Sequence, residues 1–401
     1  MVYRAGMSWS DPGGEIEALA PQLRRLRRDI HRHPELGFEE TRTQALCRAW
    51  LEDRGYAPRV CAETGLVADL RPGAPGPVIA LRADLDCLPM HETTDIEHRS
   101  IHAGKAHKCG HDGHTAILLG VAELLARHRE AVPGNVRLLF QPAEEGVRGG
   151  GAKVMLAEGA LDGVAELYGL HNWPGFPKGQ VHVRSGAMLA QVHELTLTIT
   201  GKGGHASQPQ LCRDPIVAGA HLVVALQTVV ARGLGYQGGA VLSITQFTAG
   251  TTHNVIAETA LLRGTVRTFD PTVSERVMAR LREVVAGTAA SFGVKIELEV
   301  DEGYPVLLND PRCAAAVARV AAAQLGAARV SEQDLPCAGG EDFAYFAQAV
   351  PSAYFFVGAQ RAGEDTPVCH HPDFDFDDDL IPTGVGLFLG IVRDRLAELA
   401  R

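Results

Sequence analysis

The chain has 401 residues, of which 46% are hydrophobic and 21% are charged, so it can bury a sizeable core and is not globally disordered. The formal net charge is −10 without a basic block, which argues against nucleic acid or an anionic membrane as the main partner. The start lacks a charged residue followed by an apolar run, and no stretch reaches the roughly 18 apolar residues of a membrane span, so we expect a cytoplasmic protein.

Two helices are predicted at the N-terminal end. Apolar residues at helical spacing predict the first over 15–32, which should end near Pro34 because proline disfavours helix in the residue before it. A second is predicted over 41–54. His31 and His33 can be metal ligands, but we interpret them as surface or turn residues.

A short apolar strand over 78–81 is followed by two acids, Asp84 and Asp86. Residues two apart in an extended segment point the same way, so both carboxylates can lie on one side. Each can orient a metal-bound imidazole, or the two can form a solvated loop pair. The polar stretch 91–106 is assigned to a loop.

The segment 107–115 holds a thiol and three imidazoles within a few residues. Cys109 and His111 can face one ligand together, and the apolar run 115–125 predicts a buried helix whose first turn follows them. The positive end of that helix favours a thiolate, which suits zinc and similar metals. The alternative is a reduced core cysteine near surface histidines. The eight cysteines are scattered, which favours reduced thiols over disulfides.

Further ligand types follow two predicted strands. The strand 136–141 precedes Glu144 and Glu145, between Pro142 and Gly146, so both carboxylates can reach one cavity. One can bind metal while the other handles protons. The apolar strand 167–170 places His171 at a strand end. Repeated strand-then-helix units predict a parallel or mixed α/β sheet with its site at the carboxyl ends of the strands.

A different pattern begins near residue 188. The segment 193–200 alternates apolar and polar residues, as in a half-exposed strand. Further elements are a glycine-rich turn at 201–207, helices over 215–232 and 274–292, and strands over 240–247, 259–269 and 294–300. This order fits a ferredoxin-like α+β domain over 188–301, inserted between two parts of a larger domain, 1–187 and 302–401.

The chain then returns to the larger domain. The predicted elements are a helix over 311–325, a turn at 339–343 that opens a short helix, a strand over 353–357, and a last helix over 382–399. Between the last two lie a His pair, His370 and His371, and the acidic run 375–379. Such a run is usually a solvated face, but the neighbouring histidines make a ligand possible.

Seven segments in this order resemble the amidohydrolase branch of the M20 metallopeptidases, which includes hippurate hydrolases, N-acyl-amino-acid amidohydrolases and auxin-conjugate hydrolases. They are residues 82–86, 109–115, 141–146, 170–172, 203–207, 339–343 and 370–372. The resemblance covers nearly the whole chain. It implies a zinc-peptidase-like α/β catalytic domain, with a mixed sheet flanked by helices, and an inserted lid or dimerisation domain.

The resemblance also implies a site with two divalent metal ions: zinc, manganese, nickel or cobalt. Its ligands would be Cys109, His111, Glu145, His171 and His370. Glu144 would be the general base, and Asp86 would support a metal ligand. Asp84 stands where ordinary M20 peptidases carry a metal-binding histidine, so it is not counted as a ligand. His371 stands where the family often has Asn or Ser, and His370 is preferred over it.

On the inserted domain, the resemblance implies that His205 donates to the carbonyl oxygen of the substrate. In relatives, the equivalent histidine often comes from the partner subunit, so we expect a homodimer formed through this domain. Asn254 and Arg267 match positions that hold the substrate carboxylate or assist the oxyanion. Arginine suits a carboxylate because it can bind it bidentately. The alternative for Arg267 is an ordinary salt bridge in a strand.

The implied activity is metal-dependent hydrolysis of the linear amide bond of small N-acyl amino acids, as in hippurate hydrolase. Two metal ions can share one water and lower its pKa, and Glu144 can take its proton and pass it to the leaving amine. One alternative is a dipeptidase or aminoacylase with the same chemistry. The other is a non-catalytic metal-binding dimer scaffold, which would be expected to lack a ligand or the base.

Overall fold

The computed structural model of the chain describes residues 12–71, 73–146, 149–235 and 238–400. The chain forms two compact units. Unit 1 consists of Met1–Met188, Leu308–Leu335 and Asp342–Arg401, and unit 2 consists of Leu189–Leu307 and Pro336–Glu341. The segment Pro336–Glu341 is distant in sequence from the rest of unit 2, and no change of composition marks it.

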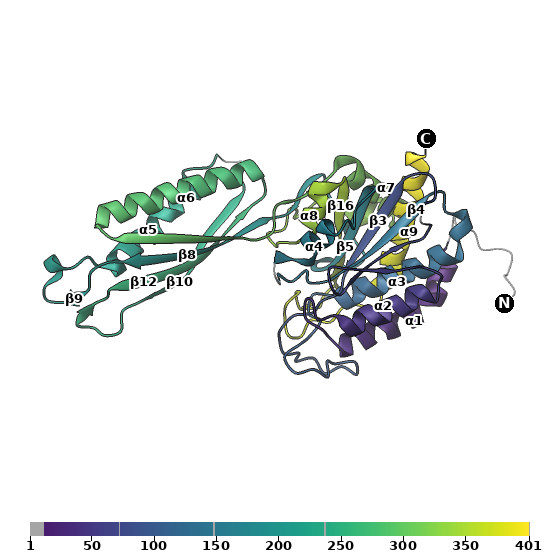
Figure 1. Cartoon of the computed structure of the whole chain (residues 1–401), viewed down its shortest axis with the longest axis horizontal. Helices are drawn as coiled ribbons and strands as arrows, with labels where there is room; N and C mark the ends of the chain where they lie inside the picture. The colour runs from purple at the N-terminus through teal and green to yellow at the C-terminus, as the bar shows by residue number, and fades with distance from the viewer. Residues whose placement is uncertain (1–11, 72, 147–148, 236–237, 401) are drawn as a thin grey trace. The chain divides into compact units, whose positions relative to one another are not determined.

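Unit 1 is built on a mixed eight-stranded sheet (Figure 1). In order across the sheet the strands are β1 (Arg59–Cys61), β2 (Gly65–Asp69), β4 (Asn135–Gln141), β3 (Val78–Asp84), β5 (Val164–Pro177), β16 (Ser352–Gln360), β6 (Val181–His182) and β15 (Val330–Ser331). The four central strands β4, β3, β5 and β16 run parallel, and β2 and β6 flank them antiparallel. The expected mixed α/β sheet is therefore confirmed.

Helices cover both faces of this sheet. One face carries α2 (Thr41–Glu52), α3 (His111–Arg127), α7 (Pro311–Leu325) and α9 (Leu380–Leu399), and α1 (Gly13–Arg32) packs outside them against α3 and α9. The other face carries the short helices α4 (Gly151–Ala157) and α8 (Phe343–Ala349). The main core lies between the sheet and α3 and α9, where Leu81, Leu118 and Leu138 are fully buried.

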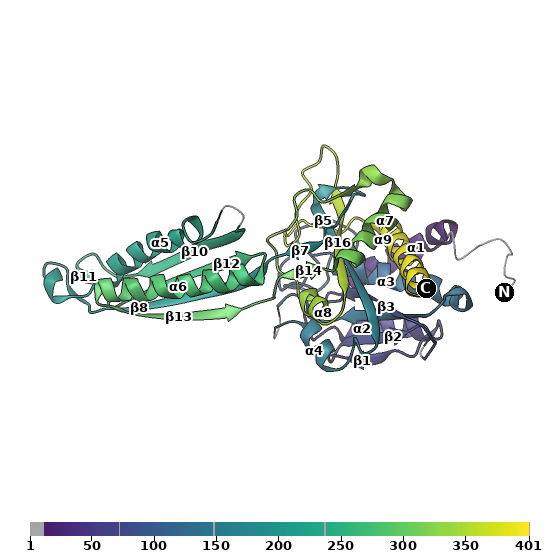
Figure 2. The same cartoon turned by 90° about the horizontal axis from the view of Figure 1, so that it is seen from above.

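Unit 2 has a four-stranded antiparallel sheet with two helices on one face (Figure 2). Across the sheet the strands are β10 (Ala240–Ala249), β12 (Thr259–Thr268), β8 (Gln191–Thr200) and β13 (Lys295–Glu302), and the helices are α5 (Pro215–Ala231) and α6 (Pro271–Phe292). The order β-α-β-β-α-β along the chain is the expected ferredoxin-like pattern. The alternation in β8 places Leu195, Leu197 and Ile199 in the core against the helices.

Small two-stranded pairings complete the fold. Strand β9 (Gly204–His205) pairs with β11 (Val255–Ile256), and β7 (Gly186–Leu189) pairs with β14 (Leu307–Asn309). Within the described residues, no helix is long and apolar enough to cross a membrane. All eight cysteines are free thiols, as their scatter predicted.

Several strands extend past their predicted ends: β3 reaches Asp84 instead of ending at residue 81, and β5 extends furthest. The sequence indicated a strand over 167–170 that ends before His171, whereas β5 continues to Pro177. The reason is the neighbouring strand β16, which stays paired with β5 as far as Trp173 and, after an irregularity, Pro177. His171 therefore projects from within a paired strand and is held more firmly than a loop residue would be.

Candidate metal centre

The predicted ligands of unit 1 and Asp86, the acid expected to support one of them, gather beyond the carboxyl ends of the central parallel strands. Asp86 follows β3, Glu145 follows β4, His171 lies in β5, and the loop after β16 carries His370. Parallel strands present their carboxyl ends at one edge of the sheet, so segments far apart in sequence converge there. This edge is the place where the strand-then-helix pattern predicted a site.

The side-chain donor atoms of this group lie close together. Three overlapping sets have all donor atoms within 4.8 Å of one another: Cys109, His111 and His171; Cys109, Glu145 and His370; and His111, Glu144 and Glu145. The shortest approaches are 3.2 Å between Cys109 Sγ and His171 Nε2, and 3.3 Å between His370 Nε2 and Glu145 Oε1. The structure thus brings together all five residues expected as ligands, with Glu144 beside them.

Hydrogen bonds on the outer side orient these ligands. His111 Nδ1 lies 2.9 Å from the Asp86 carbonyl oxygen and 3.2 Å from its Oδ1, and the backbone N–H of Glu145 donates to Asp86 Oδ2 at 2.9 Å. His171 Nδ1 lies 2.5 Å from the carbonyl oxygen of Asn172. When Nδ1 of each ring donates, its Nε2 keeps a lone pair that faces the cluster.

Two buried donor atoms in the cluster lack a hydrogen bond among the described residues: His111 Nε2 and Glu145 Oε1. Glu145 Oε1 is near His370 Nε2, but the pair lacks hydrogen-bond geometry. Buried polar atoms are normally paired, so two such atoms facing each other indicate an external partner. Thiolate, imidazole and carboxylate donors together fit zinc and related divalent metals.

The protein groups around Cys109 hold it as a thiol, contrary to the thiolate that the start of the helix was expected to favour. The Cys369 thiol, burial and the Glu145 carboxylate together raise the pKa of the Cys109 thiol well above its ordinary value. Burial lowers the pKa of His111, but the charges of Asp84 and Asp86 outweigh it and raise the pKa well above its ordinary value. A divalent cation would favour deprotonation of both groups, and its charge would offset the repulsion among the neighbouring carboxylates. The residues present therefore fit a metal centre.

Gly110 allows Cys109 and His111 to face the same cluster. Its φ of +105° is left-handed, and a Cβ at this position would meet Asn172 Oδ1 at 2.0 Å. Any other residue would strain the turn and push Asn172 away. The turn connects directly to α3, which begins at His111, earlier than the apolar run predicted.

The sequence did not assign roles to His114 and Asn172, which support the cluster from behind. His114 Nδ1 lies 2.6 Å from Asp84 Oδ1, and its Nε2 lies 2.7 Å from Asn172 Oδ1. Asp84 Oδ2 also accepts a hydrogen bond from Arg82 at 2.6 Å. Both carboxylate oxygens of Asp84 therefore have partners, His114 and Arg82. Asp84 Oδ2 is also 3.8 Å from His111 Nε2. The signal in the sequence was the position of these residues beside predicted ligands.

The two adjacent histidines after β16 have different partners. His370 points to Glu145, whereas His371 Nδ1 accepts the backbone N–H of Asp373 at 3.1 Å within its own turn. His370 has a φ of +68°, a left-handed conformation that is uncommon for a residue with a side chain. The two side chains are similarly exposed, 53% and 50%, so burial does not distinguish them.

In unit 2, His205 and Asn254 are neighbours. Both are exposed. The pairing of β9 with β11 brings their segments together, and the Asn254 carbonyl accepts the backbone N–H of Ala206 at 3.1 Å. His205 Nδ1 accepts from the Ser207 hydroxyl at 2.8 Å, which leaves Nε2 free of a described partner.

Arg267 is not part of that group. Arg267 lies near the far end of β12 from Thr259, where β12 begins shortly after the end of β11, and eight strand residues span roughly 26 Å. Its Nε donates to the Ala338 carbonyl at 3.2 Å, and burial lowers the pKa of the guanidinium. Within unit 2, one small substrate therefore cannot touch both Arg267 and His205.

Our interpretation of His31 as a surface or turn residue is wrong. Its side chain is fully buried, and its Nδ1 and Nε2 lie 2.8 Å from Asp112 Oδ2 and 3.1 Å from Glu92 Oε1. The reason is that His31 lies on the face of α1 that packs against α3, together with Leu23. His33 remains half-buried at the helix end, where its Nδ1 lies 2.8 Å from the Asp29 carbonyl oxygen.

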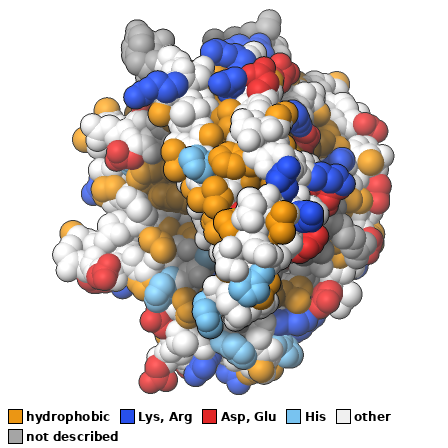
Figure 3. Space-filling view, turned by 90° about the vertical axis from the view of Figure 1, so that its left-hand side faces the viewer, with side chains coloured by type: hydrophobic (Ala, Val, Ile, Leu, Met, Phe, Trp, Pro, Cys, Tyr) orange, Lys and Arg blue, Asp and Glu red, His pale blue; other side chains and the backbone are white. Residues whose placement is uncertain are grey.

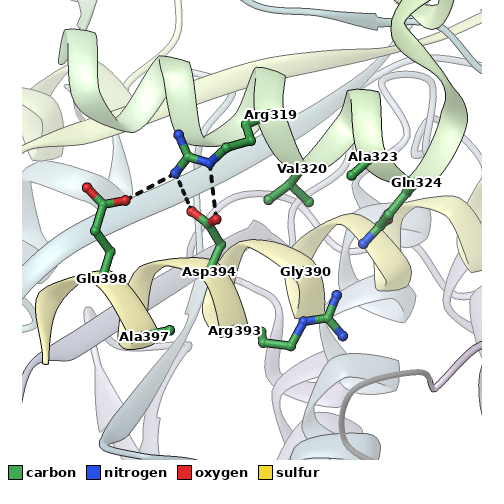
Figure 4. A pocket seen from close by; sticks show the side chains of 9 residues that line it. All are labelled: Arg319, Val320, Ala323, Gln324, Gly390, Arg393, Asp394, Ala397 and Glu398. Atoms are coloured by element: carbon green, nitrogen blue, oxygen red, sulfur yellow. Dashed lines mark hydrogen bonds and ion pairs between the residues drawn. The ribbon is translucent and has the colours of Figure 1, made fainter. Parts of the chain in front are cut away.

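The acidic run near the C-terminus is mostly ion-paired and contributes nothing to the cluster. Asp375 pairs with Arg27, and Asp377 and Asp379 pair with Lys178. A separate hollow of about 600 Å³ lies between α7 and α9, and Arg319, paired with Asp394 and Glu398, lines it together with uncharged residues such as Val320 and Ala323 (Figure 4). It contains none of the predicted site residues.

Comparison with known families gives one match that spans most of the chain. Residues 80–394 match the model of the peptidase family M20/M25/M40. This range includes all the residues of the cluster.

Two curated relatives are similar over almost their whole length. N-acetylcysteine deacetylase of Bacillus subtilis is 39% identical over 91% of this chain and 94% of its own. An IAA-amino acid hydrolase, ILR1-like 4, of Arabidopsis thaliana is 38% identical over 93% of this chain and 86% of its own. Among solved structures, this chain is similar to the Bacillus subtilis YXEP protein, which is described as a dinuclear metal-binding peptidase of the M20 family. The two superpose with a TM-score of 0.82 at 34% identity, and the match covers 96% of this chain and 99% of that one.

Proposed function

The chain belongs to the peptidase family M20/M25/M40 and is a hydrolase of its amidohydrolase type, and on that premise we propose that it hydrolyses the amide bond of N-acyl amino acids with two divalent metal ions. The ions would be held by Cys109, His111, Glu145, His171 and His370. Asp86 would position His111 and Glu145 rather than bind metal itself.

The observation that carries this proposal is the pair of buried atoms without hydrogen bonds, His111 Nε2 and Glu145 Oε1, inside the donor cluster. The similarity to a protein described as dinuclear supports two ions rather than one. Cys109 belongs both to the set with His111 and His171 and to the set with Glu145 and His370, so its thiolate would help to hold the metal.

The chemistry assigns a proton-transfer role to Glu144. When bound, divalent ions would lower the pKa of a bound water toward about 7 and polarise the amide carbonyl. Glu144 Oε2 lies 3.9 Å from His111 Nε2, at the margin of the cluster and outside the proposed ligand set. It would take the proton from the attacking water and deliver it to the leaving amine.

His205 and Asn254 would complete the site by hydrogen bonding to the substrate, and Arg267 would bind its carboxylate. Because Arg267 lies near one end of β12, and His205 of β9 lies near the other end through the pairing of β9 with β11, one molecule can meet both residues only if they come from two chains. This supports a homodimer through unit 2, in which the partner chain supplies His205 to each site.

The surface of unit 2 supports the same assembly. Strand β10 is at the edge of its sheet, and apolar side chains are exposed on it and on α5: Val241, Phe247, Ile216, Val217 and Val224. Val224 is 70% exposed. Hydrophobic side chains also gather on the surface that faces the viewer in Figure 3. An open edge strand beside apolar residues is suited to pairing with a second copy.

The relatives narrow the substrate class. The bacterial relative is named for deacetylation of N-acetylcysteine, and the plant relative for hydrolysis of an amino-acid conjugate. Both names describe removal of an acyl group from an amino acid, so we favour N-acetyl and bulkier N-acyl amino acids over free dipeptides. A panel of N-acetyl, N-benzoyl and free-amine dipeptide substrates tests this preference. Cleavage of dipeptides alone would favour the dipeptidase alternative.

The test of the metal requirement is removal and restoration. Dialysis against a chelator should abolish hydrolysis of N-acetyl amino acids, and Zn²⁺, Mn²⁺, Co²⁺ or Ni²⁺ should restore it in a folded protein. Full turnover by a protein whose metal content has been shown to be nil would overturn the proposal. Tight metal binding without turnover on any amide would favour the scaffold alternative.

A further inference from the structure

A buried network of charged and polar side chains lies behind the ligand segment 109–111. Its members are Arg27 and His31 of α1, Glu92 and Lys108 of the loops, and Asp112 of α3. Four of them are fully buried, and Glu92 is 5% exposed. The metal-centre chemistry proposed above uses none of them.

The network contacts the residues on both sides of the ligand segment. On one side, Asp112 directly follows His111, and its Oδ2 lies 2.7 Å from Arg27 Nε and 2.8 Å from His31 Nδ1. On the other side, Lys108 directly precedes Cys109, and its Nζ donates to Glu92 Oε1 at 2.7 Å. Cys109 and His111 are therefore enclosed between two buried charged anchors.

His31 joins the two anchors into one chain of contacts. Its Nε2 lies 3.1 Å from Glu92 Oε1, the oxygen that also accepts from Lys108. Arg27 contacts Asp112, Asp112 contacts His31, His31 contacts Glu92, and Glu92 contacts Lys108.

The same network reaches the segment that carries the last ligand. Lys108 Nζ donates to the Phe374 carbonyl at 2.7 Å, and the Lys108 carbonyl accepts the backbone N–H of His370 at 2.6 Å. Arg27 also pairs with Asp375. Two ligand segments distant in sequence are thus tied to one set of buried charges.

We propose that Arg27 and His31 are positioning residues, which act through Asp112, Glu92 and Lys108 to hold Cys109, His111 and His370 at metal-binding geometry. This inference rests on the proposed function, because it assumes those three ligands. Such an arrangement is costly: each buried charge loses hydration, so well-packed apolar residues would stabilise a core at least as well. Its benefit would be a fixed ligand geometry, since partners behind metal ligands commonly contribute about 10–100-fold in affinity.

The chain offers a matched control. Arg395 of α9 pairs bidentately with Glu166 of β5 at 2.8 Å for both contacts, and both side chains are buried. Glu166 lies five residues before His171 on β5, roughly 16 Å along an extended strand. Arg395→Met therefore removes another buried, ion-paired guanidinium without touching the ligand segments.

The experiment measures Zn²⁺ affinity of the metal-free full chain by competition with a chromophoric chelator, with the unfolding temperature of the metal-free protein as a parallel readout. Arg27→Met and Arg395→Met should both lower the unfolding temperature. Only Arg27→Met should weaken Zn²⁺ binding, by about 10–100-fold, and Arg27→Lys should recover part of the loss. If Arg27→Met does not fold, Asp112→Asn, which keeps the side-chain size, takes its place.

Two results would overturn the inference while leaving the proposed function intact. In the first, Arg27→Met or Asp112→Asn binds Zn²⁺ as tightly as the wild type. In the second, Arg395→Met weakens binding equally, so the loss follows general destabilisation. A folded wild type that binds no Zn²⁺ would instead overturn the proposed function itself.

Discussion

The candidate residues of unit 1 and those of unit 2 are held in different ways. In unit 1, His111 is fully buried and bonded on its outer side to Asp86. In unit 2, His205 is exposed, and its ring meets only Ser207 of its own turn among the described residues. The difference indicates that unit 1 holds its candidate residues in a preorganised arrangement, whereas the His205 ring lies on an exposed turn with only local contacts among the described residues.

The sharpest test of this contrast is Glu144→Gln in unit 1. If the reacting centre lies there, kcat should fall by about 10²–10⁴-fold, because the amide cannot accept the proton of the attacking water. The bound metal should remain, since Glu144 is outside the proposed ligand set. Steady-state kinetics and elemental analysis of one preparation measure both quantities. Near wild-type turnover would remove Glu144 from the mechanism.

His205→Ala in unit 2 should lower kcat by about 10²–10³-fold, the usual effect of losing one oxyanion donor. Metal content and unfolding temperature should not change, because the side chain is exposed and has only a local partner. A loss of metal in this variant would mean that His205 belongs with the ligands, and the contrast between the units would fail.

Mixing the two inactive variants tests whether His205 acts on the site of its own chain or on that of the partner. If His205 acts from the partner, a Glu144→Gln and His205→Ala heterodimer has one intact site of two, and random exchange makes half of all dimers heterodimers. Activity should then return to about a quarter of the wild type. Each variant incubated alone is the control. If His205 acts within its own chain, mixing restores nothing.

A smaller effect concerns the stability of unit 1. Burial and the charge of Asp86 raise the pKa of Glu40 from 4.5 to about 7, and Glu40 Oε1 accepts the backbone N–H of Ala143 at 2.9 Å. Because the folded state binds this proton more tightly than the unfolded state, the free energy of unfolding should fall as pH rises from about 4.5 to 7. The difference of about 2.5 pKa units corresponds to at most about 3 kcal/mol.

Glu40→Gln should remove that pH dependence. Urea unfolding of metal-free protein should give similar midpoints for both proteins at pH 4.5, and a higher midpoint for the variant at pH 8. Gln keeps an acceptor for Ala143, so the turn before Glu144 is preserved. Equal pH dependence in the two proteins would show that the charge on Glu40 is not the cause.

Local sequence patterns predicted most elements of the fold. The alternation in β8 and the proline-initiated helix α7 appear where the pattern placed them. The extension of β5 past His171 was not predictable from its own residues, because the pairing with β16 creates it. Helix boundaries likewise depended on neighbours: α3 begins at His111 since Gly110 supplies the left-handed turn before it.

For the site, the motif resemblance provided the expected ligands, but it did not reveal what holds them. His31 was misinterpreted because a histidine near a helix end is usually solvated. Its spacing carried a usable signal: Leu23, Arg27, Ile30 and His31 follow one helical face, and all four are buried. A charged residue on an otherwise apolar stripe predicts a buried partner, yet the identity of that partner, Asp112, required the packing of α1 against α3.

The proposed two-ion site is tested most directly by the number of metal ions that each chain binds, measured by elemental analysis of wild type, His370→Ala and His371→Ala after equilibration with Zn²⁺. The neighbouring histidines are equally exposed, but only His370 points to Glu145, so the pair is its own control. We expect two ions per chain in the wild type and in His371→Ala, and fewer in His370→Ala. A folded wild type without metal, or full occupancy in His370→Ala, would contradict the proposed metal site.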